Sequence, residues 1–493
     1  MTAQMADTGS FGPAERLHPL FVLTGLGGVA RGVWGMLAAG AFLAAQGRWR
    51  LAIMLVVLVG LGSMVRLLVQ WWTFEYRMAH DQIRIDSGLL HRNSRAIPFE
   101  RVQDVNIVQG PLQRLFGLAQ VRFETGGSAG GKEEGVLHTV SLERAEQLRA
   151  RIRERRAPAA AAAVEHVEEP AASEPLYAMD NRRLLIAGLF NFSLAVLAGL
   201  FGVTQTFGDL IGFDPFSRRF WAQALAMSEP LRQLVVTHAV LTAIAGAIVL
   251  LLIGSATGVV RTILREYGFR IDRAPAALRR RRGLLTLTDV TLPLKRAQAA
   301  LVLTGPLRRA FGWFELKLQS LAQDDRGKGD HVLAPLASES EIGALVAELG
   351  WPIAPAASDW RRISRAYLIL FLIALGPLAV IAVVEAVFFP AIGLIALAII
   401  GVAAMLRTLA WPRTRYALDG DILFVETGWW RQRRLILPIA KVQSADVSDN
   451  VLSRIFGVAT LRLGVAGGSG FSAHAVPAVP RETAFDLRRA VLA

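Results

Sequence analysis

Six long apolar runs in three close pairs constrain the fold of this chain more than any other feature. The pairs are residues 20–45 with 51–72, residues 184–207 with 234–260, and residues 367–389 with 391–410. About 20 apolar residues in a helix cross the hydrocarbon core of a bilayer. Inside lipid a single segment can satisfy its own backbone hydrogen bonds only as an α-helix. Each pair therefore predicts a transmembrane hairpin, and together they predict six spans.

The composition agrees with a membrane protein. Hydrophobic residues make up 53% of the chain and its mean hydropathy is +0.40, above the range that is usual for soluble domains. The net charge of +14 is then explained by basic loops that face anionic lipid, so no nucleic-acid partner is expected. Because the chain has no cysteine, disulfides, thiolate metal sites and thiol catalysis are excluded.

Arginines flank the outer ends of the apolar pairs and predict the orientation. They are Arg66, Arg182, Arg183, Arg261, Arg361, Arg362, Arg365 and Arg407. By the positive-inside rule, both termini and both large intervening segments are expected in the cytoplasm. Four arginines between paired runs oppose this orientation but are outnumbered: Arg48 and Arg50 in the short first connector, and Arg218 and Arg219 in the longer second one.

A threefold internal repeat follows the apolar pairs and is the most informative pattern in the chain. A proline, a glutamine five residues later, and a Phe-Gly pair thirteen residues after that recur at the same spacing. The three sets are Pro98, Gln103, Phe116 and Gly117; Pro293, Gln298, Phe311 and Gly312; and Pro438, Gln443, Phe456 and Gly457. We interpret them as fold-determining residues: a turn, a core aromatic and a backbone position that needs glycine.

Each repeat reads as several short strands closed by one helix. Alternating, β-rich segments such as residues 83–88 and 422–428 are separated by glycines, as in antiparallel sheets. Residues 141–155, 339–349 and 482–492 have apolar positions at helical spacing. Strands closed by one C-terminal helix predict a small split β-barrel in each copy.

These repeats resemble those of bacterial pleckstrin-homology (PH)-like membrane proteins, and their number is similar to the YdbT type. The resemblance implies three cytoplasmic α+β PH-like barrels in a multi-pass protein of the bacterial plasma membrane, with no catalysis and no cofactor. It also implies a smaller PH-like membrane protein as partner. The expected parts are hairpins at 18–72, 182–262 and 361–411, PH-like domains at 73–156, 263–351 and 412–493, and a linker at 157–181.

Basic residues are the candidate contacts for anionic phospholipid or a protein partner. Two clusters are Arg279, Arg280, Arg281 and Arg282, and Arg431, Arg433 and Arg434. Two repeat positions hold Arg101, Arg296 and Lys441, and Arg114, Arg309 and Arg454. Lipid headgroups attract basic residues near the surface. The alternative for the repeat positions is solvated or locally hydrogen-bonded arginine in a loop.

No catalytic or metal site is predicted. Residues 126–130 match G-x-S-x-G, but they lie in a glycine-rich hairpin turn and not in the strand-to-helix turn that a nucleophile needs. Gly28 with Gly32, and Gly254 with Gly258, fit the pattern G-x-x-x-G. Close helix packing would explain this pattern, and so would the general abundance of glycine in the chain. The favoured function is a membrane scaffold or interaction protein, and the alternative is a transporter or export accessory subunit that uses the six spans.

Overall fold

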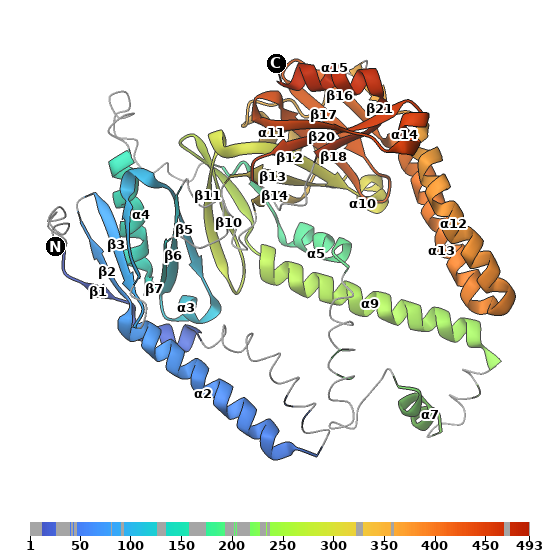
Figure 1. Cartoon of the computed structure of the whole chain (residues 1–493). Helices are drawn as coiled ribbons and strands as arrows, with labels where there is room; N and C mark the ends of the chain where they lie inside the picture. The colour runs from blue at the N-terminus through green and yellow to red at the C-terminus, as the bar shows by residue number, and fades with distance from the viewer. Residues whose placement is uncertain are drawn as a thin grey trace, which may run out of the picture. The chain divides into compact units, whose positions relative to one another are not determined.

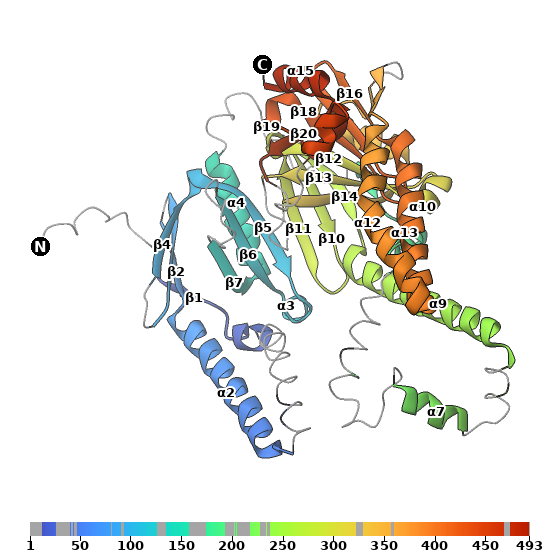
Figure 2. The same ribbon diagram turned by 45° about the vertical axis from the view of Figure 1, so that its right-hand side comes forward.

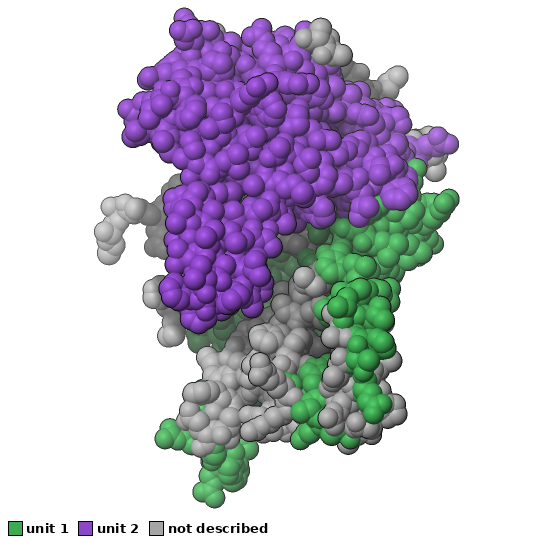
Figure 3. Space-filling view, turned by 90° about the vertical axis from the view of Figure 1, so that its right-hand side faces the viewer, with its two compact units in different colours: residues 1–172, 180–269, 281–290 green, residues 173–179, 270–280, 291–493 purple. Residues whose placement is uncertain are grey.

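The structure is a computed structural model, and the parts of the chain that it describes form two units. The described residues are 12–25, 40, 43, 47–79, 81–89, 93–125, 135–156, 174–192, 202, 204, 217–226, 233, 237–321, 329–355, 359–467 and 474–492. Residues 1–172, 180–269 and 281–290 belong to the first unit, and residues 173–179, 270–280 and 291–493 to the second (Figure 3). Each unit is considered by itself below.

Four helices in the described residues are long and apolar enough to cross a membrane. They are α2 (Trp49–Thr73), α9 (Ala239–Glu266), α12 (Ala366–Phe388) and α13 (Pro390–Ala410) (Figures 1 and 2). Only 6–12% of the most apolar stretch of each helix is buried, as expected for side chains that face lipid. The spans expected at residues 20–45 and 184–207 lie mostly outside the described residues. A short helix, α7 (Arg218–Ala226), lies between two of the apolar segments.

Glycines allow close helix contact in two places. Helix α5 (Asn181–Phe190) packs against α9, and a Cβ added to Gly258 would lie 2.7 Å from the carbonyl oxygen of Gly188. In the hairpin of α12 and α13, a Cβ on Gly393 would lie 2.1 Å from the amide nitrogen of Ala386. Close packing is therefore the right explanation of the Gly254–Gly258 pattern, because a side chain at Gly258 would separate the helices.

The first copy of the repeat consists of a four-stranded sheet, a second group of strands and a closing helix. Its elements are β1 (Glu15–Arg16), β2 (Glu75–Met78), β3 (Gln82–Ser87), β4 (Asn93–Pro98), β5 (Val102–Gln109), α3 (Pro111–Leu115), β6 (Leu118–Thr125), β7 (Gly135–Ser141) and α4 (Leu142–Arg156). Strands β1-β2-β3-β4 form one antiparallel sheet in that order, and β5, β6 and β7 pair consecutively. A 3-10 turn (Phe99–Arg101) separates β4 from β5.

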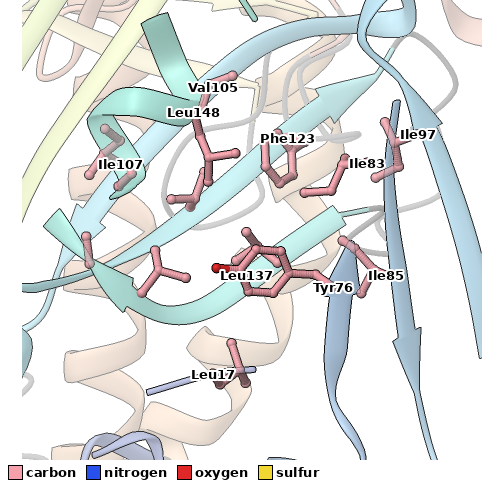
Figure 4. Close-up of a cluster of buried hydrophobic side chains, with 14 of the residues drawn as sticks. Leu17, Tyr76, Ile83, Ile85, Ile97, Val105, Ile107, Phe123, Leu137 and Leu148 are labelled. Carbon is pink, nitrogen blue, oxygen red and sulfur yellow. The ribbon is translucent and has the colours of Figure 1, made fainter. Parts of the chain in front are cut away.

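The core of the first copy joins both groups of strands to the closing helix. Ile83 and Ile97 of the first sheet, Phe123 and Leu137 of the second group, and Leu148 of α4 are all at most 3% exposed and converge in one cluster (Figure 4). Burial of one such side chain contributes about 1.5–3 kcal/mol. The alternating pattern of the sequence thus predicts the buried faces correctly.

The other two copies repeat this plan. The second contains β9 (Arg270–Ala274), β10 (Ala277–Arg282), β11 (Leu287–Pro293), β12 (Ala297–Thr304), α10 (Pro306–Ala310), β13 (Phe314–Ser320), β14 (Asp330–Ala337) and α11 (Glu339–Ala347), with the short β8 (Tyr177–Ala178) beside β9. The third contains β15 (Arg361–Arg362), β16 (Arg415–Asp419), β17 (Ile422–Thr427), β18 (Gln432–Pro438), β19 (Val442–Ser448), α14 (Val451–Ile455), β20 (Val458–Val465), β21 (His474–Pro480) and α15 (Arg481–Leu492).

The sheets correct the expectation of one barrel per copy. In the second unit, β12 of the second copy pairs with β18 of the third, which gives one sheet in the order β14-β13-β12-β18-β17-β16-β15. In the first unit, β5 of the first copy pairs with β11 of the second. None of the described sheets closes on itself. The physical reason is that a strand edge must find hydrogen-bond partners, and a neighbouring copy supplies a matching edge.

Candidate functional site

The arginine run 279–282 lies on strand β10, and the structure corrects its expected exposure to lipid. Arg280 is fully buried and donates Nη1 to the carbonyl oxygen of Val332 at 3.1 Å. Arg282 is also buried, and its Nη1 lies 3.2 Å from both carboxylate oxygens of Glu266, the last residue of α9. Alternate side chains of a strand face opposite sides, so the two arginines point inward together. The remaining members, Arg279 and Arg281, are half-buried.

The second basic cluster is also committed to internal contacts. Nε of Arg434 lies 2.6 Å from the carboxylate of Glu426, which is 1% exposed and also binds Arg415 at 2.6 Å. Arg433 reaches Nδ1 of His474 at 3.2 Å. Only Arg431 of this cluster is exposed. Arg433 and Arg434 are therefore corrected from lipid candidates to structural residues.

His474 is buried and neutral. Its Nδ1 must accept a hydrogen bond from Arg433, because a guanidinium can only donate. Its proton is then on Nε2, which donates to Oε1 of Gln319 at 2.7 Å. Burial, assisted by the nearby Arg433 charge, lowers the pKa of His474 to about 4. Gln319 belongs to the second copy, and Arg433 and His474 belong to the third. The two hydrogen bonds of His474 therefore connect these copies.

The repeat position of Arg114, Arg309 and Arg454 lies where one copy meets the next. Nη1 of Arg114 donates to the carbonyl oxygen of Leu284 at 2.6 Å, just before β11 of the second copy. In the same way Arg309 donates to the side chain of Gln432 on β18 of the third copy. Arg454, in the third copy, is exposed, and its Nε lies 3.2 Å from the carboxylate of Asp449 in the same copy. Two of these three arginines thus hold successive copies together.

The other basic repeat position behaves less uniformly. Lys441 donates Nζ to the carbonyl oxygen of Lys295 at 3.2 Å and thereby contacts the preceding copy. Arg296 donates Nη2 to the carbonyl oxygen of Leu321 at 3.0 Å within its own copy. Arg101 is exposed. Local hydrogen bonding, which was one of the two alternatives, describes Arg296, whereas Lys441 bonds to the preceding copy.

The repeat glycines and prolines occupy turns. Gly117, Gly312 and Gly457 have φ of +63°, +69° and +65° and follow the short helices α3, α10 and α14. This left-handed conformation favours glycine after a helix. Pro98, Pro293 and Pro438 each end a strand before a 3-10 turn.

The repeat glutamines differ in burial. Gln298 is buried on β12, which has a neighbour on both sides, whereas Gln443 is exposed on β19. The side chain of Gln103 is not among those that the structure describes. The repeat glutamine therefore has no single role in the described copies.

The repeat phenylalanines are not core residues, which corrects the sequence interpretation. Phe116, Phe311 and Phe456 are 45%, 68% and 39% exposed. They end α3, α10 and α14, whose other apolar side chains are also exposed: Leu112, Leu115, Leu307, Val451, Leu452 and Ile455. We call these three short helices with their phenylalanines the apolar tips. Helix α14 contacts α12, so at least this tip lies beside a helix that is long and apolar enough to cross a membrane.

An ion pair between the first two copies was missed from the sequence. Arg149 of α4 donates Nε to the carbonyl oxygen of Val105 on β5 at 3.2 Å, and its Nη1 lies 3.1 Å from the carboxylate of Asp289 on β11. The side chains are 9% and 11% exposed. Arg149 therefore binds both β5 and β11, the two strands that join the first copy to the second. We call each such pairing of strands between copies a joint. Aligning the closing helices by their first residues would have singled out Arg149. It is the eighth residue of α4, and Arg488 is the eighth residue of α15.

No group of three or more possible metal-ligating residues occurs in the described part of the chain. The G-x-S-x-G segment at residues 126–130 lies outside the described residues. The contacts that the structure does show are those of assembly: paired strands, buried ion pairs and exposed apolar tips.

Together these features define a class, a membrane protein whose apolar helices carry repeated β-rich domains joined through their strands. A family model described as Bacterial PH domain matches residues 21–156, 230–350 and 366–493. The chain therefore belongs to the bacterial PH domain family, which confirms the resemblance inferred from the repeats. It is similar to the UPF0699 transmembrane protein YdbT of Bacillus subtilis (strain 168), with 22% identity over 432 residues, 85% of this chain and 84% of YdbT. No solved structure matches the chain.

Proposed function

We propose that this protein is a scaffold of the bacterial plasma membrane that presents three PH-like domains at the cytoplasmic face. Its membrane character rests on the apolar helices and on the transmembrane relative. The observation that carries the scaffold role is the edge-to-edge pairing of β5 with β11 and of β12 with β18. Pairing of this kind is a recognised way of binding a strand from another chain.

The apolar tips support a position of the domains at the bilayer surface. An exposed apolar side chain beside a basic one suits the boundary of headgroups and acyl chains. Each tip has an arginine as the second-to-last residue of its short helix: Arg114, Arg309 and Arg454. In this proposal, lipid contact is made by the tips and by Arg431, and no longer by the buried arginines of β10.

The partner in this proposal is another membrane protein with a PH-like domain, and a smaller relative fits the requirement. Three linked domains raise the effective concentration of weak contacts, so that a stable complex needs no single strong site. The third copy is the favoured contact, because its strand β19 has no neighbour on its outer side in the described sheets.

Co-purification tests the scaffold function. The full chain, extracted in mild detergent, should retain a second membrane protein, and deletion of residues 411–493 should abolish that retention while α2 and α9 remain inserted. A variant with Arg489→Ala serves as a control for surface changes in the third copy. Arg489 is exposed, and among the described residues its ion pair is with Asp486, three positions away. An intact chain that purifies alone and turns over a small molecule would refute the proposal.

A further inference from the structure

The series of joined copies ends in two unmatched sheet edges. Strand β19 is the outer strand of the described sheet β19-β20-β21, and β4 is the outer strand of the described sheet β1-β2-β3-β4. β19 occupies the repeat position of β5 and β12, and β4 occupies that of β11 and β18. The pairs β5–β11 and β12–β18 are the two joints inside the chain. One end of the series therefore offers the first half of a joint, and the other end offers the second half.

Both internal joints use the same register. Ile107 lies opposite Asp289, and Val302 lies opposite Arg434. Ile107 and Val302 each stand ten residues before the repeat glycine, whereas Asp289 and Arg434 each stand four residues before the repeat proline. Applied to the two free edges, the same rule places Val447 opposite Ser94. Asp446 then lies opposite Arg95, and Ala445 opposite Ala96.

The side chains at these edges are compatible with that register. Asp446 and Arg95 are both exposed and carry opposite charges, and opposite charges at directly facing positions stabilise an antiparallel pair. Charges on an edge strand also prevent indiscriminate pairing. Because Asp446 and Arg95 differ in sign, pairing of β19 with β4 is favoured over pairing of β19 with β19 or of β4 with β4. Ala96 and Ser94 are exposed, although the corresponding Thr291 and Asp289 of β11 are buried in their joint.

A second, independent observation concerns Arg488. Its counterpart Arg149 binds Val105 of its own copy and Asp289 of the next copy. The counterparts of those two partners are Ala445 and Ser94. Arg488 is exposed and has no hydrogen bond or ion pair within the described residues. The closing helix of the third copy thus carries an arginine at the position that fastens the β5–β11 joint, and it contacts β19, which has no outer neighbour among the described strands.

We propose that strand β19 of one chain pairs with strand β4 of a second copy, in the register of the internal joints, and that Arg488 fastens this contact to the main chain at Ser94. The contact is head-to-tail, so it produces rings or open chains within the membrane plane. It rests on the proposed scaffold function, and it assigns the outer edge of β19 to a second copy of this chain in place of a smaller relative.

Cysteine cross-linking in the full-length protein tests the register directly, because the native chain contains no cysteine. One tagged copy carries Val447→Cys and a differently tagged copy carries Ser94→Cys; both are co-expressed, solubilised in mild detergent and oxidised. A cross-linked product that contains both tags is expected. The control pairs Val447→Cys with Arg95→Cys, whose side chain lies on the other face of the strand. This shifted pair should cross-link about tenfold less, which corresponds to a preference of about 1.4 kcal/mol for the proposed register over one shifted by a residue.

Charge and arginine variants separate a specific joint from chance proximity. Arg488→Ala should lower the cross-linked fraction about tenfold, which corresponds to loss of a charge-assisted hydrogen bond, while Arg489→Ala should leave it unchanged. Asp446→Arg should lower it as well. Combining Asp446→Arg in one copy with Arg95→Asp in the other should restore it, which shows that the variants fold.

The possible outcomes distinguish this proposal from the scaffold function. Equal cross-linking in the shifted pair, or none between copies, overturns the second-copy joint. If a smaller PH-like protein instead co-purifies in a manner that depends on residues 411–493, the joint between copies is wrong and the scaffold function stands. If nothing co-purifies and no cross-link forms, both fail.

Discussion

At the scale of single residues, two buried ion pairs lie where strands of successive copies meet. Asp289 with Arg149 fastens the joint in the first unit, and Glu426 with Arg434 lies beside the joint in the second. Removing one partner of a buried ion pair leaves an uncompensated charge, which typically costs about 3–5 kcal/mol. Glu426 and Arg434 face each other across β17 and β18, so a shift of these two strands by one residue would separate their charges.

The buried His474 predicts a loss of stability in mild acid. Its pKa is about 4 in the folded protein, whereas an unfolded histidine titrates near pH 6.5. Between these values the unfolded chain binds more protons, so the stability that is present above pH 6.5 falls as the pH drops toward 4. The loss should approach about 3 kcal/mol, measured as a lower midpoint of thermal unfolding of the detergent-solubilised protein at pH 5 than at pH 7.

Replacement of this histidine isolates its contribution. His474→Gln can hydrogen-bond but does not titrate, so its unfolding midpoint should change less between pH 7 and pH 5 than that of the native chain. His238, at the start of α9, is a matched control, because His238→Gln should preserve the full loss. An equal loss in both variants would show that other groups cause the acid sensitivity.

At the scale of secondary-structure elements, the apolar tips are the clearest exposed feature outside the spans. Each is a short helix that a glycine with positive φ ends abruptly, which leaves the last apolar side chains on the outside. Ile455 of α14 is 73% exposed and Leu115 of α3 is 76% exposed. Isolated exposed apolar residues are ordinary, but the same arrangement in three copies indicates a common surface, and the proposed one is the bilayer.

A fluorescence experiment tests membrane contact by a tip. An environment-sensitive dye attached through Ile455→Cys, the only cysteine of that variant, should show blue-shifted emission in liposomes and quenching by lipids with quenchers at shallow depth. As a control, the same dye is attached through Asp419→Cys, at the exposed end of β16. Its emission there should be that of a dye in water. Identical water-like spectra at both positions would place the tips away from the bilayer.

At the scale of the whole molecule, the proposed function depends on orientation. Arg261 lies near the end of α9 and Arg407 near the end of α13. From these positions the positive-inside rule predicts that the PH-like domains are cytoplasmic. A reporter fused after Ala163 or after Ala493 should give a cytoplasmic signal, and a reporter inserted within residues 208–220 an extracytoplasmic one. A fusion after Ala493 that reports the outside would reverse the orientation and remove the domains from the cytoplasmic leaflet.

The sequence by itself determined the kinds of parts in this protein and its threefold repeat. Apolar length identifies membrane helices because lipid accepts little else. The spacing of Pro98, Gly117 and their counterparts identifies the repeats, because a turn and a left-handed residue impose local requirements that do not depend on distant contacts. The strands and closing helices follow from periodicity for the same reason.

Only the tertiary structure decided which faces and edges those parts use. A Phe-Gly pair looks the same in a core and on an exposed tip, and four adjacent arginines look solvated until a strand directs two of them inward to Val332 and Glu266. The edge pairing of β5 with β11 and of β12 with β18 joins residues more than a hundred positions apart. Such pairing depends on which edges meet in space, and no local pattern in a chain encodes that.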